Sequence, residues 1–167
     1  MIVASAIEKM TAFYQGNLHD VNHFLKVWAF AKTIGEQEGL DAQTQLTLEL
    51  AAVVHDIACP LCREKYGNTN GKNQELESPP LVERFFEDVP VERPMVERIS
   101  WLAAHHHTYT DVYGPDNRIL LEADFLVNAD ESGLSRSAIA SMRQSVFRTG
   151  TGIRLLDSLY LQAGNKR

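Results

Sequence analysis

Apolar residues recur at steps of three and four along almost the whole chain, which is the spacing of a buried stripe on an α-helix. Near the start, Ile7, Met10 and Tyr14 follow this spacing. No segment shows a sustained alternation of apolar and polar residues, the period of a half-buried strand. The sequence therefore predicts no sheet, and we expect an all-α, single-domain helical bundle of about seven to eight helices.

Residues that favour helix starts divide this pattern into elements. Ser, Thr, Asn and Asp side chains accept hydrogen bonds from the free N–H groups of a first turn, and Pro fits there because it has no N–H to satisfy. Between residues 59 and 78 the pattern gives way to a polar stretch, for which we expect a long loop of the kind that is often functional. A turn is expected at Gly114-Pro115, followed by a helix over about Arg118–Ala129. The other expected helix starts are Asn17 or Asp20, Asp41, Ser78-Pro79-Pro80, Pro94, Ser135 and Thr151.

Length and charge restrict the kinds of partner. A chain of 167 residues has the size of one ordinary domain, so we expect a single domain over 1–167. The 16 Lys and Arg residues against 22 Asp and Glu give a formal charge of −6, so no nucleic-acid polymer is expected as a partner. No apolar run approaches the roughly 20 residues that span a bilayer, and Glu8 and Lys9 lie where a signal peptide is apolar. We therefore expect no membrane partner and a cytoplasmic location, while a homo-oligomer stays open.

A His-Asp pair at the end of an apolar helix is the strongest chemical signal. His55 and Asp56 follow the run Ala51–Val54, where a carboxylate is costly unless it is hydrogen-bonded, paired or bound to a metal. In isolation, such a pair favours a core histidine beside a capping aspartate. His23 and Asp124, however, also lie on apolar helices. If these helices converge, two imidazoles and two carboxylates form a mixed nitrogen and oxygen site for a divalent cation.

The order His23, then His55-Asp56, then Asp124, on an all-α chain of this length, resembles the HD-domain superfamily of metal-dependent phosphohydrolases. The similarity spans about residues 17–130, with the C-terminal helices expected to pack on that region. Many members follow the last aspartate with Arg-Leu-Asp, whereas residues 125–128 here are Phe-Leu-Val-Asn, which removes a charged substrate contact. The motifs that resemble the superfamily are Asp20-x-x-His23-x-x-Lys26-Val27, Ala51–Ile57 and Leu121–Asp124. A subgroup of uncharacterised predicted hydrolases is resembled by four further stretches, Lys65–Gly67, Gln74–Glu77, His105–Thr110 and Leu120–Asn128.

The resemblance implies a metal-dependent phosphohydrolase, phosphomonoesterase or phosphodiesterase, acting on a small phosphorylated metabolite, with a nucleotide as the favoured class. His23, His55, Asp56 and Asp124 would hold one or two divalent ions (Mn, Fe, Co, Ni, Zn or Mg) together with any further ligands. Such an ion polarises the phosphoryl group and lowers the pKa of a bound water. Asp56 and Asp124 would act in catalysis by orienting that water. Lys26, on the same helix face as His23, would contact the phosphate.

Three consecutive histidines bear on whether the site holds one ion or two. Successive helical residues point about 100° apart, so at most two of the three face one site. The apolar stripe of this helix predicts that His106 faces inward, that His105 lies beside it and that His107 lies outside or in the following loop. Two-metal members of the superfamily supply extra histidines from the corresponding helix, and here Glu77 would add an oxygen ligand. Alternatively, the histidines contact phosphate and Glu77 complements a helix N-terminus.

Two other functions stay open at this level. A non-catalytic, metal-dependent module that binds or senses nucleotides would hold its ligand without turnover. A di-iron oxygenase on the same scaffold would need the extra ligands His105, His106 and Glu77. Cys59 and Cys62 lack both the further ligands of a zinc site and the βαβ context of a redox motif, so we expect no role for them.

Overall fold

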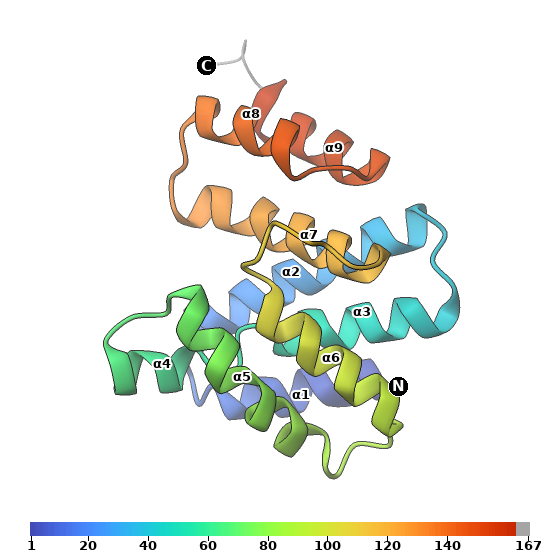
Figure 1. Cartoon of the computed structure of the whole chain (residues 1–167), viewed down its shortest axis with the longest axis vertical. Helices are drawn as coiled ribbons and strands as arrows, with labels where there is room; N and C mark the ends of the chain where they lie inside the picture. Colours follow the sequence, from blue (N-terminus) through green and yellow to red (C-terminus); the bar gives the residue numbers. More distant parts are fainter. Residues whose placement is uncertain (163–167) are drawn as a thin grey trace.

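The computed structural model describes residues 1–162, and within that range the chain is all-α (Figure 1). No strand occurs among these residues, as the sequence pattern predicts. Residues 163–167 of the expected single domain lie outside the described range. The elements are α1 (Ile2–Phe13), α2 (Leu18–Gln37), α3 (Ala42–Val54), α4 (Cys59–Tyr66), α5 (Gly71–Phe86), α6 (Arg93–His105), α7 (Pro115–Glu131), α8 (Arg136–Ser145), α9 (Gly150–Leu156) and a π-helical turn (Asp157–Leu161).

Most helices begin where the capping residues predict. Asn17 caps α2, Asp41 caps α3 and Ser135 caps α8, each by accepting a hydrogen bond from a backbone N–H of the first turn. The prediction for the start of α9 is wrong by two residues. Thr149 is the cap and accepts from the N–H three residues on, whereas Thr151 lies inside the helix. Both threonines have the chemistry of a cap, so residue type alone did not distinguish them.

The long loop expected over residues 59–78 is wrong. The helix α4 occupies the first half of this stretch, and α5 begins only four residues after α4 ends. Gly67 ends α4 at φ 70°, in the left-handed region that favours glycine. Asn70 then caps α5 by accepting a hydrogen bond from the N–H of Asn73 at 3.1 Å. The stretch therefore contributes two ordered helices, which accounts for the larger number of elements in the described range.

The helix start expected at Ser78-Pro79-Pro80 is also wrong, because both prolines lie inside α5. Proline has no N–H, so two internal hydrogen bonds of the helix are lost at this point. The buried side of α5 is formed by Gln74, Ser78, Val82 and Phe85, which lie about one helical turn apart. Two of these four residues are polar, and the buried stripe is for that reason inconspicuous in the sequence.

The helix α3 lies at the centre of the described structure. It contacts α1, α2, α6 and α7, and every residue from Thr47 to Val54 is buried. By length and hydropathy alone, the stretch Ala42–Tyr66 is apolar enough to span a membrane. However, 72% of its most apolar window is buried inside the protein, and a turn after Val54 interrupts it. Its central position accounts for its apolar character.

The C-terminal helices lie on the outer side of α7 (Figure 1). The helix α9 contacts both α7 and α2, and α8 contacts the π-helical turn. A fully buried carboxylate, Glu122 of α7, joins these layers by accepting hydrogen bonds from the backbone N–H groups of Arg148 and Thr149 and from the Thr149 hydroxyl. Gly152 packs closely against it, since a Cβ there would lie 2.1 Å from Glu122 Oε2.

Replacing Glu122 by Ala is expected to lower the free energy of unfolding by about 2–4 kcal/mol, because two backbone N–H groups and a hydroxyl lose their buried acceptor. Urea unfolding followed by circular dichroism measures the change. Glu8→Ala, at an exposed position of α1, is the matched control and should change the free energy by less than about 0.5 kcal/mol. Equal stability of the wild-type and Glu122→Ala proteins would contradict this role for the carboxylate.

Candidate metal centre

Four side chains from three parts of the fold meet at one buried point. His23 belongs to α2, His55 ends α3, Asp56 follows it, and Asp124 lies in the middle of α7. His23 Nε2 lies 3.2 Å from both His55 Nε2 and Asp124 Oδ1, and 3.3 Å from Asp56 Oδ2. His55 Nε2 lies 3.4 Å from Asp124 Oδ1 and 3.5 Å from Asp56 Oδ2. The structure thus brings together the four residues that the sequence singles out.

The end of α3 allows two adjacent residues to face the same point. In a continuous helix, neighbouring side chains point about 100° apart. Here the helix stops at His55, and backbone hydrogen bonds from Ile57 to Val54 and from Cys59 to Asp56 close a tight turn. The turn changes the direction of the chain directly after His55, so that Asp56 also approaches the cluster.

Three imidazoles are held so that, in the neutral form, a lone pair faces the cluster. His55 Nδ1 and His106 Nδ1 lie 2.7 and 2.6 Å from the backbone carbonyl three residues earlier. A carbonyl oxygen only accepts hydrogen bonds, so each Nδ1 carries the proton and each Nε2 presents its lone pair. His23 is held in the same way, with Nδ1 2.7 Å from the Glu131 carboxylate. Such support is typical of histidines that ligate metals.

The spacing of these atoms fits a divalent transition metal. A cation about 2.1 Å from each ligand separates neighbouring ligand atoms by about 3.0–3.4 Å, for angles of about 90° to 109°. Four of the five separations given above, 3.2–3.4 Å, lie in this range, and the fifth, 3.5 Å, lies just above it. Within residues 1–162, both carboxylate oxygens of Asp124 and Nε2 of His106 are buried without a hydrogen-bond partner. Buried polar atoms in that state are costly, and a cation would satisfy them.

Burial and mutual attraction together determine the charges in the cluster. Burial disfavours a charged imidazole, but the Asp124 and Asp56 carboxylates, 3.2 and 3.3 Å from Nε2, outweigh it and raise the pKa of His23 to about 9. Burial likewise opposes a charge on His106, whose pKa the Asp56 carboxylate 3.2 Å away nevertheless raises. For Asp56 and Asp124, burial favours the neutral acid, yet the surrounding imidazoles hold the pKa of both carboxyls below the usual range. Two ionised carboxylates therefore make this buried point attractive to positive charge.

Glu131 holds the His23 ring in place and also forms an ion pair with Lys26. One Glu131 oxygen faces His23 Nδ1, and the other accepts a hydrogen bond from Lys26 Nζ at 3.1 Å. Lys26 is half-exposed and does not line the cavity over the cluster, so the predicted phosphate contact through this residue is not supported by its position. Sequence reasoning missed Glu131, although its position seven residues after Asp124 places both on one face of α7.

The three consecutive histidines are arranged differently from the prediction. His106 faces inward as predicted, is fully buried, and places Nε2 3.2 Å from Asp56 Oδ1. The placement predicted for His105 is wrong, because its ring stacks on Trp101 with 4.3 Å between centroids and its Nδ1 faces the carbonyl of that residue. His107 lies in the turn after α6, one of the two placements predicted, but it also lines the cavity and can offer a ligand atom together with His106 and Asp124.

The end of α6 explains this arrangement. The helix ends at His105, so the helical stripe that pairs this residue with Trp101 does not continue to the two histidines that follow. His107 is then fixed by α5: Gln74 Nε2 lies 3.1 Å from His107 Nε2, and a Cβ on Gly71 would lie 3.0 Å from His107 Cβ. The neighbouring His106 and burial lower the pKa of His107 to about 4, so this ring is neutral near pH 7.

Glu77 does not belong to the cluster, and its prediction as a metal ligand is wrong. Its carboxylate accepts hydrogen bonds from Lys65 Nζ at 2.5 Å and from the Tyr66 hydroxyl at 2.6 Å. These bonds tie α4 to α5. The prediction rested on a flexible loop that could bring Glu77 inward, whereas the residue belongs to a helix whose inward position is Gln74.

Asp56 stands between two groups of nitrogen donors. Its Oδ2 faces His23 and His55, and its Oδ1 faces His106. His106 and His107 can also share Asp124 as a third donor. The chain therefore offers donors for a second cation beside the first, with Asp56 placed to contact both.

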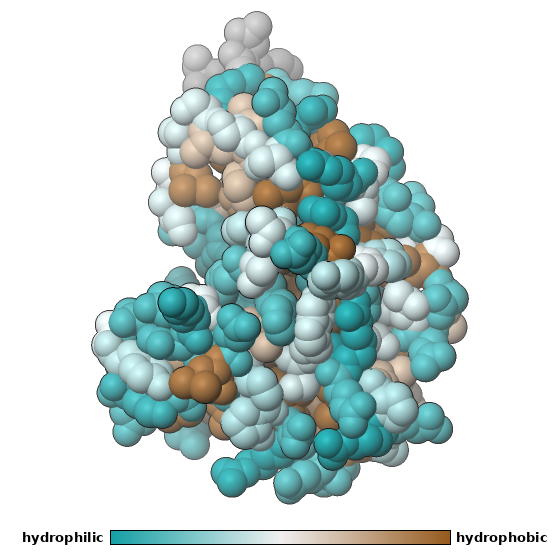
Figure 2. Space-filling model, viewed as in Figure 1, coloured by the Kyte–Doolittle hydropathy of each residue, from teal (hydrophilic) through white to brown (hydrophobic). Residues whose placement is uncertain are grey.

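The cluster opens into a cavity of about 170 Å³. The surface is indented and largely hydrophilic between the part formed by α4 and α5 and the part formed by α7 to α9 (Figure 2). Two lining residues share a helix face with a residue of the cluster, since Asp20 precedes His23 by three residues and Asn128 follows Asp124 by four. Besides the cluster, the lining includes His19, Asp20, Arg63, Thr69, Gln74 and Asn128.

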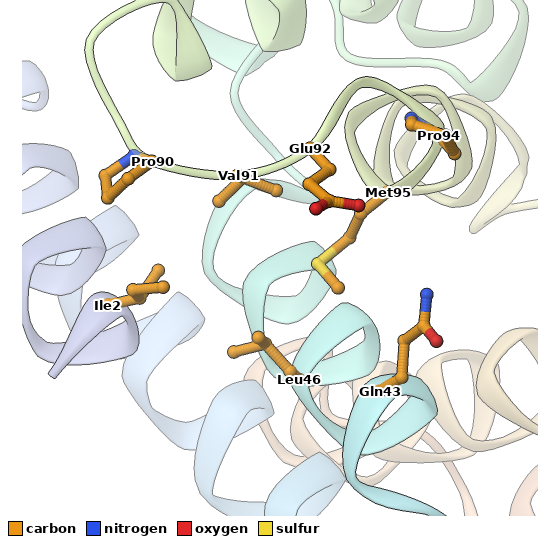
Figure 3. Close-up of a pocket in the computed structure, with 8 residues that line it drawn as sticks. All are labelled: Ile2, Gln43, Leu46, Pro90, Val91, Glu92, Pro94 and Met95. Atoms are coloured by element: carbon orange, nitrogen blue, oxygen red, sulfur yellow. The ribbon is translucent and has the colours of Figure 1, made fainter.

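A larger cavity, of about 360 Å³, lies between α1, α3 and the connection from α5 to α6 (Figure 3). Its walls are mostly apolar, with Leu46 of α3 facing Val91 and Met95. Glu92 is its one carboxylate, and no histidine or cysteine lines it. Because it holds no cluster of titratable groups, the chemistry belongs to the smaller cavity.

A family model described as "HD domain" matches residues 20–132. This range includes all four residues of the cluster as well as His106 and His107. No curated protein matches the chain.

Binding of a divalent cation is expected to release a proton at pH 7. The pKa of His23 in the metal-free protein is about 9, so its imidazole is protonated at pH 7 and must lose that proton to coordinate a metal. The apparent affinity should therefore rise at least about tenfold per pH unit from pH 7 to 9 and level off above pH 9. Calorimetric titration with Zn²⁺ in buffers of different ionisation enthalpy measures the released protons. His105→Ala should release the same number, and an absence of proton release would contradict coordination by His23.

The wild-type protein is expected to bind two equivalents of metal, and the His106→Ala variant one, because His106 is the nitrogen that faces Asp56 Oδ1. Elemental analysis of protein dialysed against Mn²⁺ or Zn²⁺ measures the stoichiometry. His105→Ala, which removes an imidazole outside the cluster, should retain both equivalents. Saturation of the wild-type protein by a single equivalent would mean that His106 and His107 contact phosphate or water instead.

Proposed function

Because this chain belongs to the HD-domain family, we propose that it is a metal-dependent phosphohydrolase acting on a small phosphorylated compound. Members of this family are mostly metal-dependent phosphohydrolases. The observation that carries the proposal is the convergence of His23, His55, Asp56 and Asp124 at 3.2–3.5 Å, with the imidazole lone pairs directed at one another. Without a cation or protons, this arrangement is repulsive.

The chemistry of the donors suits phosphoryl transfer. When bound here, a divalent ion supplies a Lewis acid that polarises a phosphoryl oxygen and makes a water more acidic. Asp56 and Asp124 provide two negative charges, which balance those of one divalent ion. The remaining negative charge of a substrate phosphate must then be met by other donors around the cavity.

Hydrolysis requires a proton to be taken from the attacking water and a proton to be given to the departing oxygen. The water oxygen forms a bond to phosphorus, the bond from phosphorus to the ester oxygen breaks, and a proton passes overall from the water to the departing oxygen. Asp56 and Asp124 are ionised and can accept a hydrogen bond from the attacking water. His107 is neutral near pH 7 and lines the cavity, so its ring can form a hydrogen bond to the reacting groups when it does not ligate a metal.

The alternatives are less well supported by the positions of the side chains. The oxygenase interpretation needed His105, His106 and Glu77 as extra ligands, and only His106 lies at the cluster. A module that binds a phosphorylated ligand without turnover would use the same residues, and an activity measurement separates it from an enzyme.

The purified protein is expected to release inorganic phosphate from a phosphate monoester such as p-nitrophenyl phosphate when Mn²⁺, Co²⁺, Ni²⁺, Zn²⁺, Fe²⁺ or Mg²⁺ is supplied. A chelator should stop the release, and added metal should restore it. Asp124→Asn should lower the rate by about 100-fold or more, because it removes a charged ligand. His105→Ala is the control and should keep the wild-type rate. If the protein binds metal but no phosphate ester is turned over with any ion, the non-catalytic module is the better interpretation.

A further inference from the structure

The cavity over the cluster is too small and too hydrophilic for an enclosed nucleotide. Its volume of about 170 Å³ lies below the roughly 300–1,000 Å³ of pockets that enclose drug-sized ligands. Every side chain in its lining other than Cys59 is polar or charged, and among residues 1–162 it has no Phe, Tyr, Trp or branched aliphatic wall. Proteins commonly hold nucleobases by stacking them on such aromatic faces.

The uncharged lining groups match hydroxyls better than a base. Thr69, Gln74 and Asn128 line the cavity, and hydroxyl and amide groups both donate and accept hydrogen bonds. Gln74 Nε2 is already used by the Thr69 carbonyl and by His107, whereas Gln74 Oε1 is buried without a partner in the described range. Thr69 and Asn128 are therefore the uncharged side chains left for an alcohol group of a ligand.

Arg63 is the only lysine or arginine that lines this cavity within the described residues. It belongs to α4, in the stretch that forms two helices instead of the expected loop. Its Nη1 and Nη2 donate to the two carboxylate oxygens of Asp20 at 2.7 and 3.0 Å, and Asp20 is itself buried. A guanidinium group held in this way is already oriented, so the side chain loses little conformational freedom when it binds an anion.

The ion pair with Asp20 uses only some of the hydrogen-bond donors of Arg63. A guanidinium has five N–H groups, and the hydrogen bonds to Asp20 use two of them. The remaining three make no other hydrogen bond within residues 1–162, and 45% of the side chain is exposed. Because Asp20 neutralises the charge at long range, Arg63 contributes directed hydrogen bonds of the kind that fit phosphate oxygens.

We propose that this cavity selects short, hydroxylated phosphate monoesters, such as phosphorylated polyols and small sugars, and that Arg63 binds their phosphate group. The turnover of these compounds rests on the proposed phosphohydrolase function, whereas phosphate binding by Arg63 does not. Water adds to the monoester, the bond from phosphorus to the ester oxygen breaks, and the products are the free alcohol and inorganic phosphate. The selectivity differs from the nucleotide class that the sequence favoured.

The first test measures binding of inorganic phosphate to the metal-loaded protein by calorimetry. Arg63→Gln should weaken binding by about ten- to hundredfold, the range for loss of hydrogen bonds to a charged group. Arg63→Lys, which keeps the charge but loses the planar fork, should give an intermediate loss and guards against a folding defect in the first variant. Arg93→Gln, at an exposed position of α6, is the matched control and should bind like the wild type. Metal content should be equal in all four proteins.

The second test compares the kcat/KM values of glycerol 3-phosphate and ribose 5-phosphate with those of AMP and deoxy-AMP. At least one of the short compounds should exceed both nucleotides by about tenfold or more, the discrimination that a few contacts provide. A nucleotide preference would overturn the substrate class while leaving the phosphohydrolase function intact. Absence of turnover with every compound would overturn the proposed function and, with it, the substrate class. Wild-type phosphate affinity in both Arg63 variants would overturn the role of Arg63.

Discussion

The close approach of buried imidazoles and carboxylates is the constraint on which the rest of the structure depends. Nitrogen atoms of three histidines and oxygen atoms of two aspartates face one another where little water is present to screen them. They stay in place because each imidazole is held from behind, by a backbone carbonyl or by Glu131. The helices α2, α3, α6 and α7 must therefore keep fixed positions, and the central, fully apolar part of α3 provides the rigid support.

This constraint separates two tasks between different parts of the fold. The central helices α2, α3 and α7 supply a buried cluster whose charge two aspartates can balance. The helices α4 and α5 supply groups that line the cavity over the cluster. Arg63 belongs to α4, and Gln74, which contacts His107, belongs to α5. Because the protein carries a net charge of −6, attraction of an anionic compound has to be local. The polar lining around the cluster is where that attraction is available.

The sequence predicted the cluster well because its members stand out: His23, His55, Asp56 and Asp124 are ionisable residues beside apolar neighbours on the buried sides of their helices. The sequence-based prediction failed at positions where helical spacing no longer determines the direction of a side chain. His107 lies beyond the last helical residue of α6, where side-chain direction is set by contacts from α5 and not by helical spacing. The helix α5 itself was hidden because Gln74 and Ser78 occupy its buried side and two prolines lie inside it. Arg63 carries no sequence signal, since its partner Asp20 is 43 residues away.

The positions of the ligands along the chain have a consequence for how the molecule opens. His23 and Asp124 are about one hundred residues apart, so a cation bound to both would close a covalent and coordinate ring through most of the chain. Like a disulfide, such a ring restricts the unfolded chain. The helices α2 and α7 could then separate only after the ion dissociates. In contrast, α1, α8 and α9 lie outside the ring, so fraying of either terminus can occur while the ring remains closed.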